Sequence, residues 1–386
     1  MRLWFKRAKS GMVEITQNQE SRDGSAQTQI GQQIIVGVSE KRVREICDEK
    51  LAYAIRDLTN EAHDVAYNRV SDLVTQVLEK ISKRKLNTVI FSDPKFQREV
   101  VKAQSSAAAA DRKSDIEMLS ELLVARMDGR LLRKTHTGIS RAIEIVSDID
   151  DDELSALTVL YAFANFRPIP VLGVRLSKGL AVLDDLYTRL NVRSLPQGEA
   201  WMENLNMLDA IILSPLGKFK NVVEYYSEVM DGYVCVGIAK NSSDYLKAQQ
   251  ILASAQLPVE ILVRNELLPG YVRLPFVAQR ECAELPLFNS VPDGTNRSVI
   301  SKLVKPSECQ IAAMKEVLAL YNKDTGLKNG VEKAFEHEWG KRPSLAALQE
   351  WVGGLHKSFE ITRVGAALAY TNARRCAPGL PPFDLK

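Results

Sequence analysis

The sequence has 386 residues, of which 45% are hydrophobic, and its formal net charge at pH 7 is +3. This length allows two or three domains of the usual ~100–200 residues, and the hydrophobic content excludes a chain that is mostly disordered. The small net charge gives no bulk electrostatic reason to expect nucleic acid as a partner.

The N-terminal segment "MRLWFKRAKS" combines aromatic and basic residues. Trp4 and Phe5 stand beside Lys6 and Arg7, and such a combination can contact an anionic membrane surface or a partner protein. The alternative is an irregular terminus in which two aromatic residues adjoin by chance. Because burying unpaired basic groups is costly, we expect Trp4 and Phe5 to be exposed or docked on a partner.

A short β-prone tract, "TQIGQQIIVGV", occupies residues 28–38. β-Branched residues between glycines favour one or two short strands. A strand this short is unstable alone, and its backbone groups need hydrogen-bonding partners. Pairing with the same tract of a second copy would supply them; the alternative is a strand that folds back on its own chain. The candidate self-association residues here are Ile30, Ile34, Ile35, Val36 and Val38.

Residues 39–84 contain neither proline nor glycine, and their apolar residues recur mostly at steps of three, four or seven. With Ser39 as N-cap, this pattern predicts one helix of roughly 44 residues, about 66 Å long. A helix of this length with a narrow apolar stripe needs a partner along its length. Its candidate self-association residues are Ile46, Leu51, Leu58, Val65, Leu73 and Val77.

The rest of the sequence predicts a multi-helix body with few short strands, so the expected fold class is mainly α. Asp93 before Pro94 is typical of a helix start, and Ser114 with Glu117 predicts a capping box. Prolines and polar residues indicate an irregular connection after the central body. The expected divisions are an irregular tail with the β-prone tract at 1–38, the long helix at 39–84, a central helical body at 85–263, the connection at 264–305 and a C-terminal helical region at 306–386.

No complete catalytic or metal-binding motif occurs. The segment "GVRLSKGLAV" has five residues between Gly173 and Gly179, which is the wrong spacing for a phosphate-binding Walker loop. "HEWGK" begins like a zinc-protease helix, but Lys341 stands where the second histidine belongs. We therefore expect no catalytic residue, metal or cofactor. A site assembled in space from scattered charged residues leaves no local motif and stays open.

The four histidines also lack partner motifs, so each is expected to be a packing or surface residue; they are His63, His136, His337 and His356. Five cysteines are widely spaced and include no CxxC pair, which favours a reducing cytoplasm. No apolar run approaches the ~18 residues of a membrane span.

Three stretches in order resemble an uncharacterised family of bacterial, mostly helical proteins. They are "MRLWFK" with "TQIGQQIIVGVSEKRVREI", then "FSDPKFQREVVKAQSSAAAADRKSDIEMLSELLVARM", and finally "ITRVGAALAYTNARRCAPGLPPFDL". The chain departs from the family at Gly31-Gln32-Gln33, where relatives have Gly-Gly-Asp, and at Tyr370, where histidine is common. The family has no known activity that the resemblance could transfer to this chain. Its N-terminal tract resembles tracts that precede assembly or effector modules in bacterial antiviral proteins, which implies a role in phage defence.

Together these observations favour a non-enzymatic cytoplasmic assembly protein. The N-terminal tract and long helix would form a homo-oligomer, and the helical body would bind a partner protein or sense a signal. The alternatives are a motif-poor enzyme or toxin-like effector, and a protein held at the inner membrane surface by its basic aromatic N-terminus.

Overall fold

The computed structural model describes residues 5–6, 39–54, 60–127, 133–168, 175–214, 217–280, 287–292 and 298–381. The β-prone tract at 28–38, Trp4 and Arg7 lie outside these residues, as does Leu58.

The described residues form a mainly α-helical protein, as the sequence predicts. They contain fourteen α-helices, joined in places by short 3-10 turns. The helices are α1 (Glu40–Ala54), α2 (Asn60–Arg84), α3 (Pro94–Ala109), α4 (Lys113–Arg126), α5 (Arg133–Ile145), α6 (Asp151–Asn165), α7 (Leu176–Arg189), α8 (Ala200–Met207), α9 (Val222–Val229), α10 (Ser243–Ser254), α11 (Glu308–Ala319), α12 (Thr325–Gly340), α13 (Pro343–Gly353) and α14 (Arg363–Cys376).

The strands in the described residues are short and pair antiparallel in four small sheets. Three sheets are two-stranded, β1–β2, β3–β9 and β7–β8, and one has the order β4–β6–β5. The strands are β1 (Phe5–Lys6), β2 (Arg167–Pro168), β3 (Ile211–Ser214), β4 (Ile238–Ala239), β5 (Val263–Arg264), β6 (Tyr271–Arg273), β7 (Leu287–Pro292), β8 (Ser298–Val304) and β9 (Ser358–Ile361).

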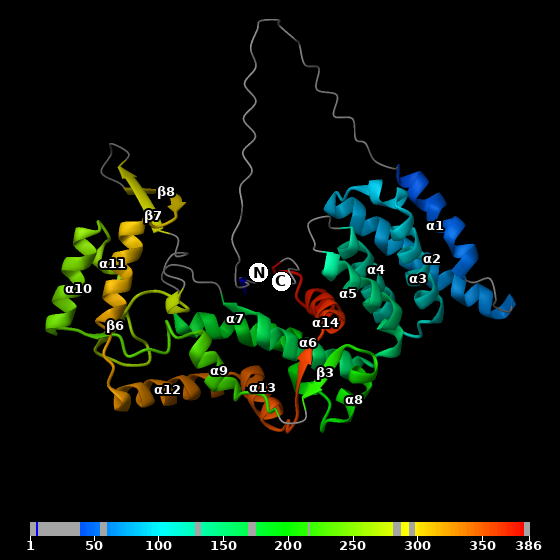
Figure 1. Cartoon of the computed structure of the whole chain (residues 1–386). Coiled ribbons are helices and arrows are strands. Elements are labelled where there is room, and N and C mark those ends of the chain that lie inside the picture. Colours follow the sequence, from blue (N-terminus) through cyan, green and yellow to red (C-terminus); the bar gives the residue numbers. More distant parts are fainter. Residues whose placement is uncertain are drawn as a thin grey trace, which may run out of the picture.

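Helices α1–α6 and the sequence-distant α14 pack together, and we refer to them as the helical lobe (Figure 1). α14 contacts α4, α5 and α6. Two glycines permit close approaches of α14: a Cβ on Gly138 in α5 would lie 2.8 Å from the carbonyl oxygen of Arg363, and one on Gly365 would lie 2.0 Å from that of Ala210, which directly precedes β3. Inside the contact, the buried Asn372 donates from Nδ2 to Thr158 Oγ1 at 3.0 Å.

The prediction of one straight helix over 39–84 was wrong. In a continuous helix Ala54 and Asn60 would be about 9 Å apart and no closer contact between the two halves could form. Instead α1 and α2 contact each other, and both pack on α3. α3 has sixteen residues, and at 1.5 Å per residue it is only about 24 Å long. Because α1 and α2 contact each other more closely than a continuous helix allows, they are two separate helices that share α3 as a packing partner.

A second, smaller core lies at the other end of the molecule from the helical lobe (Figure 1). Strands β4–β6 pack there with α10 and α11, and we call this part the sheet lobe. Its core includes Leu252, Phe276 and Met314, all fully buried. Helices α7, α9, α12 and α13 lie between the two lobes (Figure 1).

The connection expected to be irregular at 264–305 contains β6, β7 and β8, which corrects that prediction. Prolines suggested irregular backbone, but proline is tolerated in edge strands, and both strands of the two-stranded β7–β8 sheet are edge strands. Pro292 is the last residue of β7. Within the central body, α8 ends at Met207, and β3 follows and pairs with β9.

Candidate functional site

The N-terminal candidate residues are described only in part. The backbone of Phe5 and Lys6 forms β1, which pairs with Arg167 and Pro168 of the same chain. Whether this segment also contacts a membrane or a partner protein stays a prediction.

The apolar stripe predicted for self-association is largely used within one chain. Ile46, Leu73 and Val77 are buried in the main core, and Leu51 is partly buried against it. Val65 on α2 differs, because half of its surface is exposed. Self-association of these helices stays a prediction, and among the described stripe residues Val65 is the most accessible to a second copy.

One histidine belongs to a buried polar network that links α3, α4 and α5. Arg126 Nε lies 2.6 Å from Glu99 Oε2, and both side chains are at least nine-tenths buried. Arg126 Nη1 lies 2.9 Å from His136 Nδ1, so the ring nitrogen is the acceptor. Ser140 Oγ donates to Glu99 Oε1 at 2.6 Å. The network holds three helices together within the core; the other three histidines are exposed.

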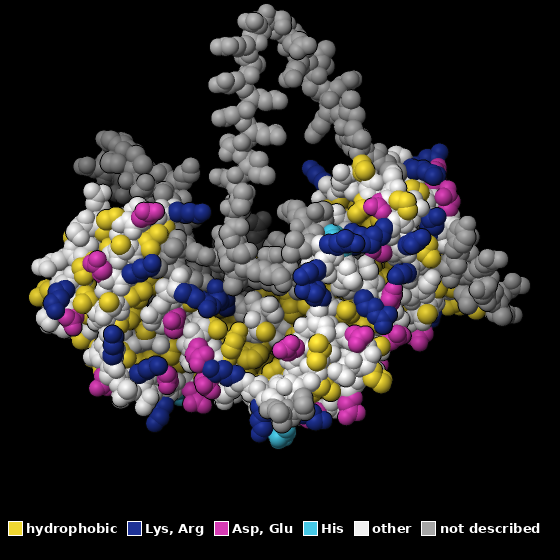
Figure 2. Space-filling view, viewed as in Figure 1, with side chains coloured by type: hydrophobic (Ala, Val, Ile, Leu, Met, Phe, Trp, Pro, Cys, Tyr) yellow, Lys and Arg dark blue, Asp and Glu magenta, His cyan; other side chains and the backbone are white. Residues whose placement is uncertain are grey.

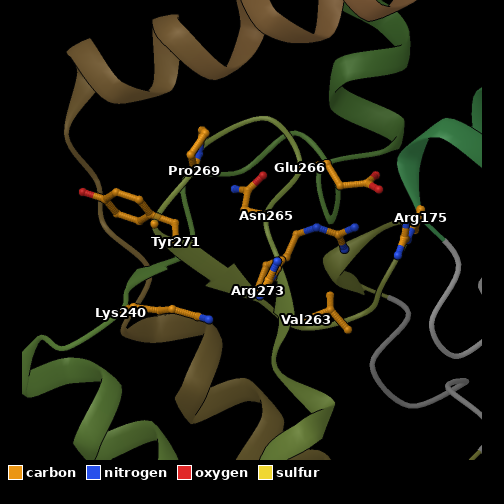
Figure 3. Close-up of a pocket in the computed structure, with 10 residues that line it drawn as sticks. Arg175, Lys240, Val263, Asn265, Glu266, Pro269, Tyr271 and Arg273 are labelled. Carbon is orange, nitrogen blue, oxygen red and sulfur yellow. The ribbon is translucent and has the colours of Figure 1, made fainter.

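The feature with the clearest binding chemistry is a cavity of about 700 Å³ in the sheet lobe (Figure 3). Four cationic side chains and a single carboxylate, that of Glu266, contribute to its lining among the described residues. We call it the cationic pocket. Its residues are Arg175, Lys240, Val263, Arg264, Asn265, Glu266, Pro269, Gly270, Tyr271 and Arg273.

The turn between β5 and β6 shapes the pocket, and Asn265 holds that turn in place. Asn265 is buried; its Nδ2 donates to the carbonyl oxygens of Cys235 at 2.7 Å and Val236 at 3.1 Å. Its Oδ1 accepts from the Leu267 backbone N–H at 2.9 Å. Gly270 has a φ of +86°, a left-handed conformation that favours glycine. All hydrogen bonds of the Asn265 amide thus serve to fix the backbone, which leaves the neighbouring charged groups to contact a ligand.

A second glycine allows β4 to approach β6, so that Lys240 reaches the pocket. Gly237 has a φ of +77°, and a Cβ there would lie 2.2 Å from the Val272 carbonyl oxygen. Beyond β4, the Lys240 backbone N–H donates to the Gly270 carbonyl oxygen at 2.9 Å. Arg175, which is the N-cap residue of α7, reaches the pocket from another side.

Arg273 is the most unusual residue of the pocket because its side chain is only 2% exposed. Successive strand residues point to opposite faces, so Val272 faces the sheet-lobe core and Arg273 does not. Its guanidinium carbon lies 4.4 Å from the centre of the Tyr233 ring, and Nη1 donates to the Leu274 carbonyl oxygen at 3.0 Å. Burial raises the pKa of Tyr233 to about 12, although the nearby Arg273 acts to lower it. The phenol is therefore neutral near pH 7 and offers Arg273 a π face, not a counter-charge.

The described residues contain no ion pair that neutralises the four pocket cations. Elsewhere the buried Arg126 is paired with Glu99, and the partly exposed Arg112 is paired with Asp115 at 2.9 Å. Glu266 is exposed and makes no ion pair with the cations, although it lines the same cavity. Figure 3 shows Lys240 and Arg175 on opposite sides of Arg273. The arrangement concentrates positive charge that is not neutralised by the side chains around it.

The excess of positive charge is confined to the cationic pocket. In Figure 2 basic and acidic side chains are intermingled over the face that is drawn. Within the described residues, no three His, Cys, Asp or Glu side chains are grouped in a way that could hold a metal ion. None of the described helices has both the length and the hydropathy needed to cross a membrane.

Comparison with known proteins gives one match, which covers part of the helical lobe. A model of an uncharacterised family matches residues 37–178, which include α1–α6 and less than half of the chain. No curated protein and no solved structure matches the chain. The cationic pocket, apart from Arg175, lies outside the matched segment.

Sequence patterns did not reveal the pocket. Its cations come from four separate positions between residues 175 and 273, and three of them lie in short strands or turns. The one local segment that resembles a phosphate-binding motif is "GVRLSKGLAV", which contains Arg175. Its two glycines have the wrong spacing for a Walker loop. The absence of a Walker loop does not bear on the cationic pocket, because that pocket combines the start of α7 with the β5–β6 hairpin, which is distant in the sequence.

Proposed function

We propose that the chain is a non-enzymatic binding protein that holds a small anionic ligand in the cationic pocket. The observation that carries this proposal is Arg273, a nearly buried guanidinium without an ion pair among the described residues. Placing an unpaired charge in a protein interior is costly, and an anion bound in the pocket would offset that cost. The sheet lobe, and not the helical body as the sequence suggested, would then sense the ligand.

The chemistry of the lining favours binding over catalysis. Among the described lining residues Glu266 is the single carboxylate, and none is a histidine, cysteine or serine. Guanidinium groups are poor proton carriers near neutral pH, whereas they bind phosphate and carboxylate oxygens through paired N–H donors. A motif-poor enzyme or toxin-like effector remains the alternative and would need acid–base groups from elsewhere in the chain.

Removing two exposed pocket cations is expected to weaken anion binding without harming the fold. We expect Lys240→Gln combined with Arg264→Gln to lower the affinity for tripolyphosphate at least about tenfold, because charge-assisted hydrogen bonds contribute about 1.5–3 kcal/mol. Isothermal titration calorimetry at low salt measures this. Affinity should also fall as salt rises, because exposed charges are screened.

Arg193→Gln is the matched control for this experiment. Arg193 is exposed and lines a different cavity, of about 200 Å³, beside Trp351. The Arg193 variant should bind tripolyphosphate within about twofold of the unmodified chain, since a charge outside the pocket is screened. Equal weakening in both variants, or no binding to the unmodified chain, would contradict the proposed site.

Self-association through the N-terminal tract and the helices after it is a second proposal, and the half-exposed Val65 on α2 supports the part that concerns the helices. Deleting residues 1–38 is expected to leave a folded helical protein of lower oligomeric order, because the tract would no longer pair between copies. Light scattering at matched concentrations gives the masses, and circular dichroism controls for folding. Val65→Gln should act in the same direction, whereas Val89→Gln, which also replaces an exposed valine, should not. Equal masses for the full and shortened chains would remove the assembly role from the tract.

The proposed setting is the bacterial cytoplasm, with antiviral defence as the context that the family resemblance implies. The described cysteines support a reducing compartment, because Cys47, Cys235, Cys309 and Cys376 are all free thiols. We also propose that the basic aromatic N-terminus contacts the inner surface of the membrane.

A further inference from the structure

The charge of the cationic pocket indicates what kind of anion it suits. Four cations and one carboxylate give the lining a formal charge of 4 − 1 = +3. A single carboxylate or an orthophosphate carries less negative charge than this and would leave the buried Arg273 incompletely balanced. A chain of two or three phosphates carries about −3 to −4 near neutral pH, because each phosphate adds one or two charges.

The geometry favours a phosphate chain over a compact anion. Arg273 approaches from β6, Arg175 from the start of α7 and Lys240 from the turn after β4. In Figure 3 these three residues are spread along the cavity and not gathered around one point. Guanidinium groups match the paired oxygens of phosphates, and the positive end of the α7 dipole at Arg175 adds to the attraction.

The size and the remaining lining indicate that the ligand also has a ring. A cavity of about 700 Å³ is much larger than a phosphate chain needs and lies in the range of sites for nucleotide-sized molecules. Tyr271, Pro269 and Val263 supply apolar surface. In Figure 3 Tyr271 and Arg175 lie at opposite ends of the group of lining residues, and Lys240 lies on the same side of Arg273 as Tyr271.

We propose that the cationic pocket binds a nucleoside polyphosphate. Its phosphate chain lies against Arg273, Arg175 and Lys240, and its base lies against Tyr271. This inference rests on the proposed function, because it names the class of anion that the same site takes.

Titration calorimetry of the full-length chain with six probes tests the inference. The probes are ATP, GTP, CTP, UTP, tripolyphosphate and citrate. At least one nucleoside triphosphate should bind at least about tenfold more tightly than tripolyphosphate, because stacking of a base on an aromatic ring contributes about 1–3 kcal/mol. Citrate, which carries a similar charge on carboxylates, should bind more weakly than tripolyphosphate.

Two variants separate the contact to the phosphate chain from the contact to the base. Tyr271→Ala should lower the affinity for the preferred nucleotide about tenfold and leave tripolyphosphate within about twofold. Arg175→Gln should weaken both ligands. Tyr67→Ala, which removes a half-exposed tyrosine from α2, should change neither.

The possible failures are distinguishable. If tripolyphosphate binds in the pocket but no nucleotide binds more tightly, the anion site stands and the nucleotide inference is wrong. The same conclusion follows if Tyr271→Ala weakens both ligands equally. If none of the six probes binds, the proposed function fails together with the inference.

Discussion

Replacing Glu99 with alanine is expected to lower the free energy of unfolding by about 3–5 kcal/mol, because it leaves a buried arginine without its counter-charge. Arg126 would keep His136 as its neighbour, 2.9 Å from Nη1, but an imidazole supplies no negative charge. Ser140 would lose its acceptor at the Glu99 carboxylate as well. Urea unfolding followed by circular dichroism measures the loss.

Asp185→Ala provides the comparison for an exposed ion pair. Asp185 Oδ2 lies 2.9 Å from Arg189 Nε within α7, and about two-fifths of each side chain is exposed. Such surface pairs contribute about 0–1 kcal/mol. If Glu99→Ala costs no more than Asp185→Ala, the network between α3, α4 and α5 does not stabilise the helical lobe as its burial implies.

Two glycine-to-alanine changes within helices are expected to have opposite signs. Alanine is normally preferred to glycine in a helix by about 0.5–1 kcal/mol, and an alanine Cβ at Gly330 in α12 would meet nothing within 4 Å to oppose that preference. Gly330→Ala should therefore stabilise the chain. Gly365→Ala should destabilise it by about 1–3 kcal/mol, because its Cβ would lie 2.0 Å from the Ala210 carbonyl oxygen and the backbone would have to shift.

Thermal unfolding of the two variants and the unmodified chain checks this pair. A rise in midpoint for Gly330→Ala together with a fall for Gly365→Ala is the expected result. Two changes of the same sign would mean that helix propensity outweighs the packing of α14 against the strand region near Ala210.

Local signals located many helices correctly from the sequence. Asp93 caps α3 as expected, with its Oδ1 accepting from the Lys95 backbone N–H at 2.6 Å. Ser39 also caps α1, through the Arg42 backbone N–H at 3.3 Å. These predictions succeed because a cap depends on residues that are neighbours in the sequence.

Tertiary contacts explain the predictions that failed. Ser114 does not cap α4, which begins one residue earlier at Lys113 and has Arg112 at its N-cap. Arg112 is held by ion pairs to Asp115 and Asp151, and the latter lies in α6. The single helix at 39–84 fails for a similar reason, because periodicity cannot show that α1 and α2 share α3 as a packing partner.

The candidate site was beyond sequence reasoning for a different reason. Arg264 and Arg273 come into one pocket only through the β5–β6 pairing, in which Arg264 lies opposite Val272 and Arg273 opposite Val263, and Arg175 joins them from the start of α7. No spacing rule relates these positions. Nor does composition reveal them, because the chain's 51 basic residues are nearly balanced by 48 acidic ones.

The position of α14 in the sequence has a consequence for synthesis on the ribosome. Helices α4, α5 and α6 are complete by Asn165, but the helix that packs against all three ends at Cys376. At translation rates of 5–20 residues per second, roughly 10–40 s pass between these two points. During that interval the apolar surface that α14 later covers faces the solvent of the cell. We therefore expect the nascent chain to bind chaperones that shield such surfaces until α14 has been synthesised.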